Sequence, residues 1–143
     1  MGLPQNTIFV SGPVIVENGK VLLIRAKKDM GVSAWQFPGG KKEKSDVDFE
    51  ATCKREAKEE LNIDLNIKEL LKEITVNDSD KKIILIHYLA ERIGNILPGQ
   101  EVLEWGWHDI DNLPQNSAPN IYEVIKEYKK KETEKKEVDF NKR

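Results

Sequence analysis

Long apolar runs are absent from this sequence of 143 residues. No stretch reaches the roughly 18 consecutive apolar residues that a membrane-spanning helix needs, and the N-terminus lacks the charged and then apolar pattern of a secretory signal. The opening MGLPQN has Asn6 where a myristoylation signal needs Ser or Thr. We therefore expect no membrane segment, no lipid anchor and a cytoplasmic location.

Cysteine and histidine are scarce as well. Cys53 is the single cysteine, which excludes an internal disulfide and fits a reducing compartment. It falls on the apolar side of a predicted helix, which favours a core position over a nucleophile. His108 has no second histidine or cysteine at ligand spacing, so we do not expect it to bind a metal.

Net charge is also small, at −2. No broad basic field is present to attract nucleic acid or an anionic membrane, so we expect neither as a partner. Any phosphate recognition must then be local or mediated by a metal ion. The expected partner is a small molecule, and a homodimer is left open.

Short, dense apolar runs such as VLLI and IILIHYLA are what the sequence does contain. They predict a folded body with a very polar surface, and the length suits one domain. We assign that domain to residues 1–130. The almost wholly charged tail, residues 131–143, either extends the last helix or frays.

The order of the predicted elements indicates an α+β layered fold with a mixed β-sheet between helices. Asn18 and Gly19 separate two strand-like runs and predict a hairpin. A helix is predicted from about Val47 to Leu61, and further strands follow, the first two of them joined at the turn NDSD. Ser117 is the expected N-cap of a last amphipathic helix.

The helical stretch KREAKEEL places three glutamates on one side of its last two turns: Glu56, Glu59 and Glu60. Like charges at this spacing, near the negative end of the helix dipole, are unfavourable unless a cation binds there. The alternative is an ordinary solvated face, in which Arg55 pairs with Glu59 one turn away.

The stretch GGKKEKSDVDFEATCKREAKEELNI resembles the Nudix box, G-x5-E-x7-R-E-U-x-E-E-x-G-U with U aliphatic, as found in MutT-like hydrolases. It departs from the box in three ways. One extra residue separates Gly40 from Arg55, and the first glutamate is either shortened to Asp46 or replaced in its role by Glu43 or Glu50. Asn62 replaces the last glycine and suits a left-handed helix end.

WQFPGG and EWGWHDIDNLP are similar to the segments that usually flank the box in this family, so the likeness spans roughly residues 7–128. It implies a Nudix-type α/β/α sandwich. It also implies a hydrolase that cleaves the pyrophosphate linkage of a nucleoside diphosphate derivative with Mg²⁺ or Mn²⁺: a nucleoside triphosphate, a dinucleoside polyphosphate or a nucleotide sugar. A non-catalytic Nudix-fold module that senses a nucleotide is the alternative.

The resemblance assigns metal binding to Glu56, Glu59 and Glu60, with a backbone carbonyl of the glycine turn at Gly40. It makes Glu59, Glu56 and Arg55 the catalytic candidates, with Arg55 orienting a box carboxylate. Which glutamate takes a proton is left open.

Residues outside the helix are weaker candidates. Glu101 and Glu104 could add an acid to the metal site or be strand-edge charges. Arg25, with Lys27 and Lys28, could meet phosphates or belong to a solvated turn. For substrate binding we name Arg25, Gly39 and Trp35. Trp35, Phe37 and Trp107 could stack on a base, although aromatic residues in short strands are more often core.

Overall fold

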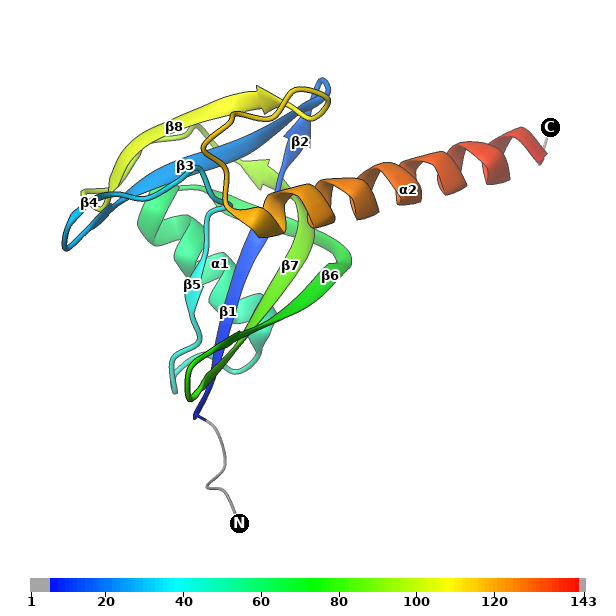
Figure 1. The fold of residues 1–143 in the computed structure, drawn as a ribbon. Helices are drawn as coiled ribbons and strands as arrows, with labels where there is room; N and C mark the ends of the chain where they lie inside the picture. The colour runs from blue at the N-terminus through cyan, green and yellow to red at the C-terminus, as the bar shows by residue number, and fades with distance from the viewer. Residues whose placement is uncertain (1–5, 142–143) are drawn as a thin grey trace, which may run out of the picture.

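The computed structural model describes residues 6–141, which form ten helices and strands (Figure 1). In chain order these are β1 (Asn6–Val14), β2 (Val16–Glu17), β3 (Lys20–Lys28), β4 (Gly31–Val32), β5 (Gly40–Lys41), α1 (Phe49–Leu61), β6 (Asp64–Asp78), β7 (Lys81–Ile93), β8 (Val102–Asp109) and α2 (Pro119–Asn141). Neither helix carries an apolar stretch of membrane-spanning length within the described range.

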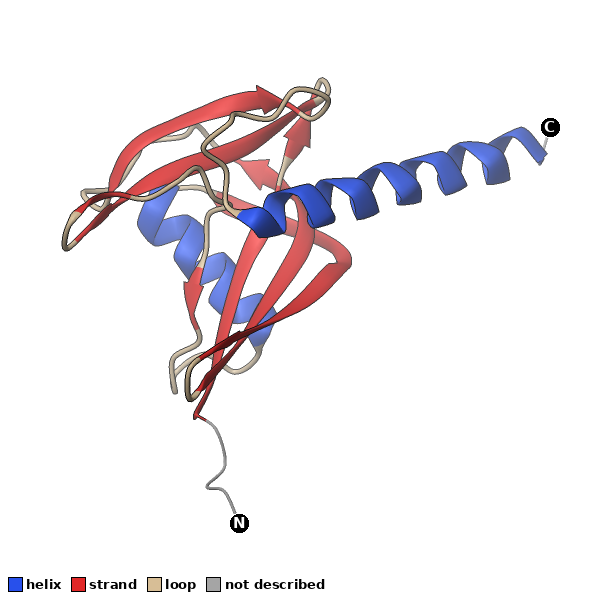
Figure 2. Ribbon diagram, in the orientation of Figure 1, coloured by secondary structure: helices blue, strands red, loops and turns tan. Residues whose placement is uncertain are grey.

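The strands form two sheets that lie between the helices (Figure 2). One has the order β5-β1-β7-β6; β1 pairs in parallel with β7, and the neighbouring pairs are antiparallel. The other has the order β2-β3-β4, with β8 also paired to β3. The predicted mixed sheet between helices is therefore confirmed.

Strand β3 explains why VLLI is continuously apolar. Successive side chains of a strand point to opposite faces, so a strand covered on both faces needs apolar residues throughout. Leu22 and Ile24 pack with Cys53 of α1, whereas Val21 and Leu23 pack with the core face of α2. One core therefore lies under each helix, and the sheets are held between the two.

Local signals determine the turns and the ends of α1. Asn18 and Gly19 have φ of 53° and 75°, and they join β2 to β3 as the predicted hairpin. Asp48 caps α1 by accepting the amide of Ala51, so the helix begins two residues later than predicted. Asn62 ends it with φ of 57°, the left-handed conformation expected there.

The prediction for the start of α2 was wrong. The Ser117 hydroxyl donates to the carbonyl of Pro114 instead of accepting an amide of the helix, which begins at Pro119. The amide of Ala118 is satisfied by the Trp35 carbonyl, so the loop before β5 takes part in holding this end. At its other end the helix continues to Asn141, so the charged tail extends α2 away from the body (Figure 1).

Candidate active site

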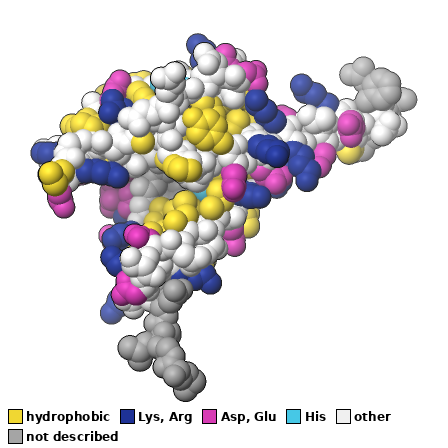
Figure 3. All heavy atoms as spheres, viewed as in Figure 1, with side chains coloured by type: hydrophobic (Ala, Val, Ile, Leu, Met, Phe, Trp, Pro, Cys, Tyr) yellow, Lys and Arg dark blue, Asp and Glu magenta, His cyan; other side chains and the backbone are white. Residues whose placement is uncertain are grey.

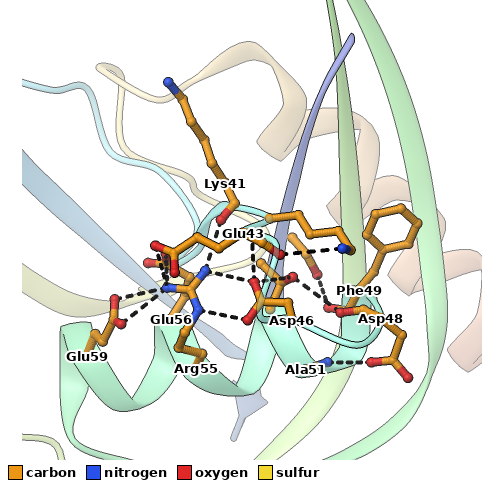
Figure 4. Close-up of polar contacts among 12 residues, drawn as sticks. Lys41, Glu43, Asp46, Asp48, Phe49, Ala51, Arg55, Glu56 and Glu59 are labelled. Atoms are coloured by element: carbon orange, nitrogen blue, oxygen red, sulfur yellow. Dashed lines mark hydrogen bonds and ion pairs between the residues drawn. The ribbon is translucent and has the colours of Figure 1, made fainter.

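Arg55 lies at the centre of an acidic cluster beside the glycine turn (Figure 4). Its Nε and Nη2 donate to the two carboxylate oxygens of Asp46 at 2.9 and 3.0 Å. The amide of Glu43 and the hydroxyl of Thr52 also donate to Asp46. These bonds to the charged form, above all those from Arg55, hold the pKa of Asp46 well below its usual range.

Asp46 therefore occupies the position that the sequence left open between three acids. Asp46 is 6% exposed, whereas the next residue, Val47, is 89% exposed. The additional residue of the loop is thus accommodated in solvent, and the helix keeps its register. Glu43 forms only a long ion pair with Arg55, with 3.7 Å between its Oε1 and Nη1 of Arg55. Glu50 is exposed in the first turn of α1.

The third nitrogen of the Arg55 guanidinium faces the box glutamates. Nη1 donates to Glu56 at 3.0 Å and to Glu59 at 3.2 Å. Glu59 has 57% of its side chain exposed, so this pair one turn apart matches the solvated-face alternative for that residue. The bond from Nη1 of Arg55 to Glu56 holds a carboxylate that is half-buried.

Glu60 is half-buried like Glu56, but it differs from Glu56 and Glu59 because no cation pairs with it. Its Oε1 accepts the amide of Gly39 at 2.8 Å, and within the described part of the chain no lysine or arginine pairs with it. Burial raises its pKa to about 8, with the Gly39 amide opposing this and the charges of Glu56 and Glu59 adding to it. Burial also raises the pKa of Glu56.

The glycine turn is what lets both carboxylates come close to the main chain. A Cβ on Gly40 would overlap the Glu56 carboxylate, so that carboxylate lies directly against the backbone. Gly39 supplies an amide to Glu60. The two acids thus converge on one turn from successive turns of α1, separated by four residues.

This arrangement suits a hard cation. Mg²⁺ takes oxygen ligands and is often held by one or two carboxylates, with waters and substrate phosphates completing its shell. Glu56 and Glu60 could supply such a pair, and their raised pKa values reflect negative charge and burial that a cation would compensate. Among residues 6–141 no three acidic, histidine or cysteine side chains converge as a metal group, and Glu59 faces Arg55.

Stability at different pH values should report on Glu60. Its pKa rises from 4.5 to about 8 on folding, so between these values the folded protein binds more protons than the unfolded chain. We expect the unfolding free energy of the metal-free protein to fall as pH rises from 4.5 to 8, by at most about 1.4 kcal/mol per pH unit from this group. Glu60→Gln should reduce that slope. Urea unfolding in a chelating buffer measures it, and equal slopes would contradict the prediction.

The structure brings Arg25, Trp35 and Glu104 together. The guanidinium of Arg25 lies 5.9 Å from the ring centroid of Trp35, and its Nη1 donates to Glu104 at 3.2 Å. Its Nε donates to the Ser33 carbonyl. Glu104 is therefore engaged with Arg25, and the three residues form a cluster that joins β3, β8 and the loop before β5.

Glu101 lies in the segment that approaches the end of α1. The amide of Gly99 donates to the carbonyl of Glu60 at 2.8 Å, and Lys27 donates its amide to the carbonyl of Glu101. This places the main chain of the β7–β8 connection against the acidic helix, with the Glu101 side chain exposed. Lys28 is exposed beside β4.

Other side chains lie where packing was expected. Phe37 is 7% exposed in the core under α2, and Trp107 packs against the core under α1. Cys53 is fully buried, and burial raises its pKa to about 12. His108 lies edge-on to Trp35, with ring centroids 4.3 Å apart.

A cavity of about 170 Å³ on the other side of the glycine turn was not anticipated. Strands β1 and β7, the loop before β5 and the first turn of α2 line it, and it opens to solvent; its lining includes Val10, Phe37, Gly39, His87 and Asn120. Figure 3 shows hydrophobic side chains gathered around the hollow near the start of α2. The one sequence signal was a polar histidine inside the apolar run IILIHYLA.

Comparisons with known proteins agree with this fold. The family model described as NUDIX domain matches residues 7–128. An ADP-ribose pyrophosphatase of Methanocaldococcus jannaschii is 31% identical over 118 residues, which are 80% of this chain and 69% of that protein.

Solved structures are similar over nearly the whole chain. A MutT NUDIX hydrolase from Burkholderia pseudomallei has a TM-score of 0.76 and 26% identity, with 86% of this chain and 98% of that one covered. A MutT protein from Methanosarcina mazei has a TM-score of 0.78 over 92% and 99% of the two chains; at 19% identity it shows the shared fold alone.

Proposed function

The chain belongs to the NUDIX family as a MutT-like pyrophosphohydrolase, and from this premise we propose that it cleaves the pyrophosphate linkage of a nucleoside diphosphate derivative in a reaction that requires Mg²⁺ or Mn²⁺. The observation that carries the proposal is the pair Glu56 and Glu60, two carboxylates held against one glycine turn. A like-charge pair so placed is costly in a helix without a ligand.

The reaction needs phosphate charge to be neutralised and a water to be positioned, with little covalent help from the protein. A bound divalent cation would lower the pKa of a coordinated water and stabilise charge on the departing phosphate. Glu56 and Glu60 would hold the cation, and Glu59 becomes a third ligand if it leaves Arg55. Arg55 holds Glu56 in place through Nη1 while Asp46 fixes its other two nitrogens.

The cavity beside Gly39 offers room for a part of the substrate other than its phosphates. Gly39 lines the cavity and also donates its amide to Glu60. A ligand with its diphosphate at the carboxylates could therefore place a base in the hollow. The ADP-ribose pyrophosphatase relative makes ADP-ribose the first compound to test.

Two departures from the box in the sequence, the stretched loop and the missing first glutamate, were the main support for the sensing alternative. Neither disturbs Arg55, because Asp46 accepts from it through both oxygens and the additional residue lies in solvent. Arg55 thus contacts both Asp46 and Glu56 despite the altered box.

A substrate panel tests the proposal. ADP-ribose, a nucleoside triphosphate, a dinucleoside polyphosphate and a nucleotide sugar are each incubated with the protein, with and without Mg²⁺ or Mn²⁺, and the phosphate products are measured. We expect hydrolysis of at least one compound that depends on the cation. Hydrolysis of none, by folded protein, would favour the sensing module.

Metal affinity tests the assignment of Glu60 directly. By calorimetry we expect Glu60→Gln to weaken Mg²⁺ binding by about tenfold or more, because a half-buried carboxyl that can bind a cation as a carboxylate becomes a neutral amide. Lys58→Gln is the matched control, since Lys58 is an exposed neighbour on the same helix that pairs with Asp64. Unchanged affinity in Glu60→Gln would remove Glu60 from the ligands.

A further inference from the structure

His87 is a polar ring in the wall of the cavity, and both of its nitrogens are bonded. The residue is 4% exposed, with the Phe37 ring edge-on at 5.3 Å between centroids. Nδ1 lies 3.1 Å from the carbonyl oxygen of Lys72, and Nε2 lies 3.0 Å from Nδ2 of Asn120. The histidine thus connects β6 to the first turn of α2.

The chemistry of these partners fixes where the proton is. A carbonyl oxygen can only accept, so the contact with Lys72 requires a proton on Nδ1. Burial of the ring lowers the pKa of His87 and favours the neutral form, in which Nε2 then has no proton and can only accept. The atom of Asn120 that lies at Nε2 of the neutral ring must therefore be its amide nitrogen.

The orientation of the Asn120 amide follows. One N–H of Nδ2 donates to His87, which prevents the amide from turning over; its oxygen therefore stays in one place, and among residues 6–141 no donor is bonded to it. Asn120 lines the cavity and is partly exposed. The oxygen is thus a hydrogen-bond acceptor at a fixed place in this wall, whereas a freely rotating amide could present either its oxygen or its nitrogen there.

We propose that His87 is a positioning residue for specificity, which holds Asn120 as an acceptor and so makes the cavity select a nucleobase edge that presents an N–H donor. The inference rests on the proposed function in taking the cavity as the place of the substrate's base. A sugar hydroxyl could donate or accept, so it would not be discriminated in this way. An amino or ring N–H group would be favoured over an analogue that lacks it.

The tautomer can be observed without any ligand. Long-range nitrogen–proton NMR spectra of the whole chain, labelled with ¹⁵N, distinguish a protonated Nδ1 from a protonated Nε2. We expect His87 in the neutral form with its proton on Nδ1 at pH 7, and the side-chain amide protons of Asn120 shifted by the bond to Nε2. A proton on Nε2 would overturn the proposal.

Selectivity is tested with two matched pairs of nucleoside 5′-diphosphates: adenosine against purine riboside, and guanosine against inosine. Each pair differs by one amino group, and binding is followed by NMR in a chelating buffer, where no turnover is needed. We expect at least one pair to differ by about 3- to 10-fold in Kd, the value of one hydrogen bond. His87→Phe should reduce that ratio to about one, whereas His108→Phe, a change in the other histidine, should keep it.

The outcomes separate this inference from the proposed function. If wild-type protein distinguishes neither pair, or if His87→Phe keeps the ratio while remaining folded, the role of His87 is overturned, whatever the panel of diphosphates shows. If the ratio behaves as expected but no compound is hydrolysed, the positioning role stands and the hydrolase proposal fails.

Discussion

Replacing Glu56 by glutamine is expected to lower the kcat of the best diphosphate substrate by about 100-fold or more, the scale on which a preorganised charge-stabilising group is felt. The carboxylate lies against Gly40 and accepts from Arg55 at 3.0 Å, so a neutral amide of the same shape removes the charge without a large loss of packing. Steady-state kinetics at saturating Mg²⁺, with the fold checked by circular dichroism, measures the effect.

Glu50→Gln is the control for this experiment. It makes the same chemical change on the same helix, but Glu50 is exposed in the first turn of α1, where a surface charge contributes a few tenths of a kcal/mol. Its rate should stay within about twofold of the wild-type rate. Equal, small effects of both substitutions would mean that the glutamates form an ordinary charged face, and the sensing module would then be the better hypothesis.

The elements that the sequence predicted well depend on neighbours in the chain. Asn18 and Gly19 form their hairpin because two successive residues with positive φ suit this pair. Asn62 ends α1 in the left-handed conformation, and the apolar face under that helix follows from its spacing. Helical spacing alone likewise puts Glu56 and Glu60 on one side of α1, because residues four apart lie one turn from each other.

The features that the sequence could not predict depend on contacts between distant segments. The amide of Gly39 reaches Glu60 across 21 positions, and this contact distinguishes the half-buried carboxylate of Glu60 from the exposed Glu59. His87 and Asn120 are 33 positions apart, and the cavity exists because β7 and the start of α2 meet there. No pattern within one short segment of the sequence predicts that two such distant segments come into contact.

Ser117 and Asp46 show how tertiary contacts override or resolve a local signal. Serine before a predicted helix is normally a good N-cap, yet the loop before β5 satisfies the neighbouring amide and leaves the hydroxyl to Pro114. The sequence could not choose between three acids for Arg55. The choice depends on the path of the loop, which buries Asp46 and exposes Val47.

Gly12 carries the largest expected effect on stability. A Cβ at this position would overlap the Pro38 carbonyl oxygen and lie 2.8 Å from the Cα of Gly39, so β1 and the glycine turn touch through their main chains. Main-chain atoms cannot rotate away as a flexible side chain can, so Gly12→Ala should push the turn from the strand. We expect a loss of about 3 kcal/mol or more in the free energy of unfolding, at or above the upper end of ordinary overpacking, measured by urea denaturation.

Gly31→Ala separates crowding from backbone strain. Gly31 has φ of 97°, but nothing lies within 4 Å of a Cβ built there, so its cost should be limited to about 1–2 kcal/mol of unfavourable conformation. If Gly12→Ala costs no more than this control, the two backbones are not packed as tightly as the structure has them. If it costs more, the glycine turn that carries Gly39 and Gly40 to the carboxylates is held there by β1, and the position of the acidic pair depends on a residue that touches neither acid.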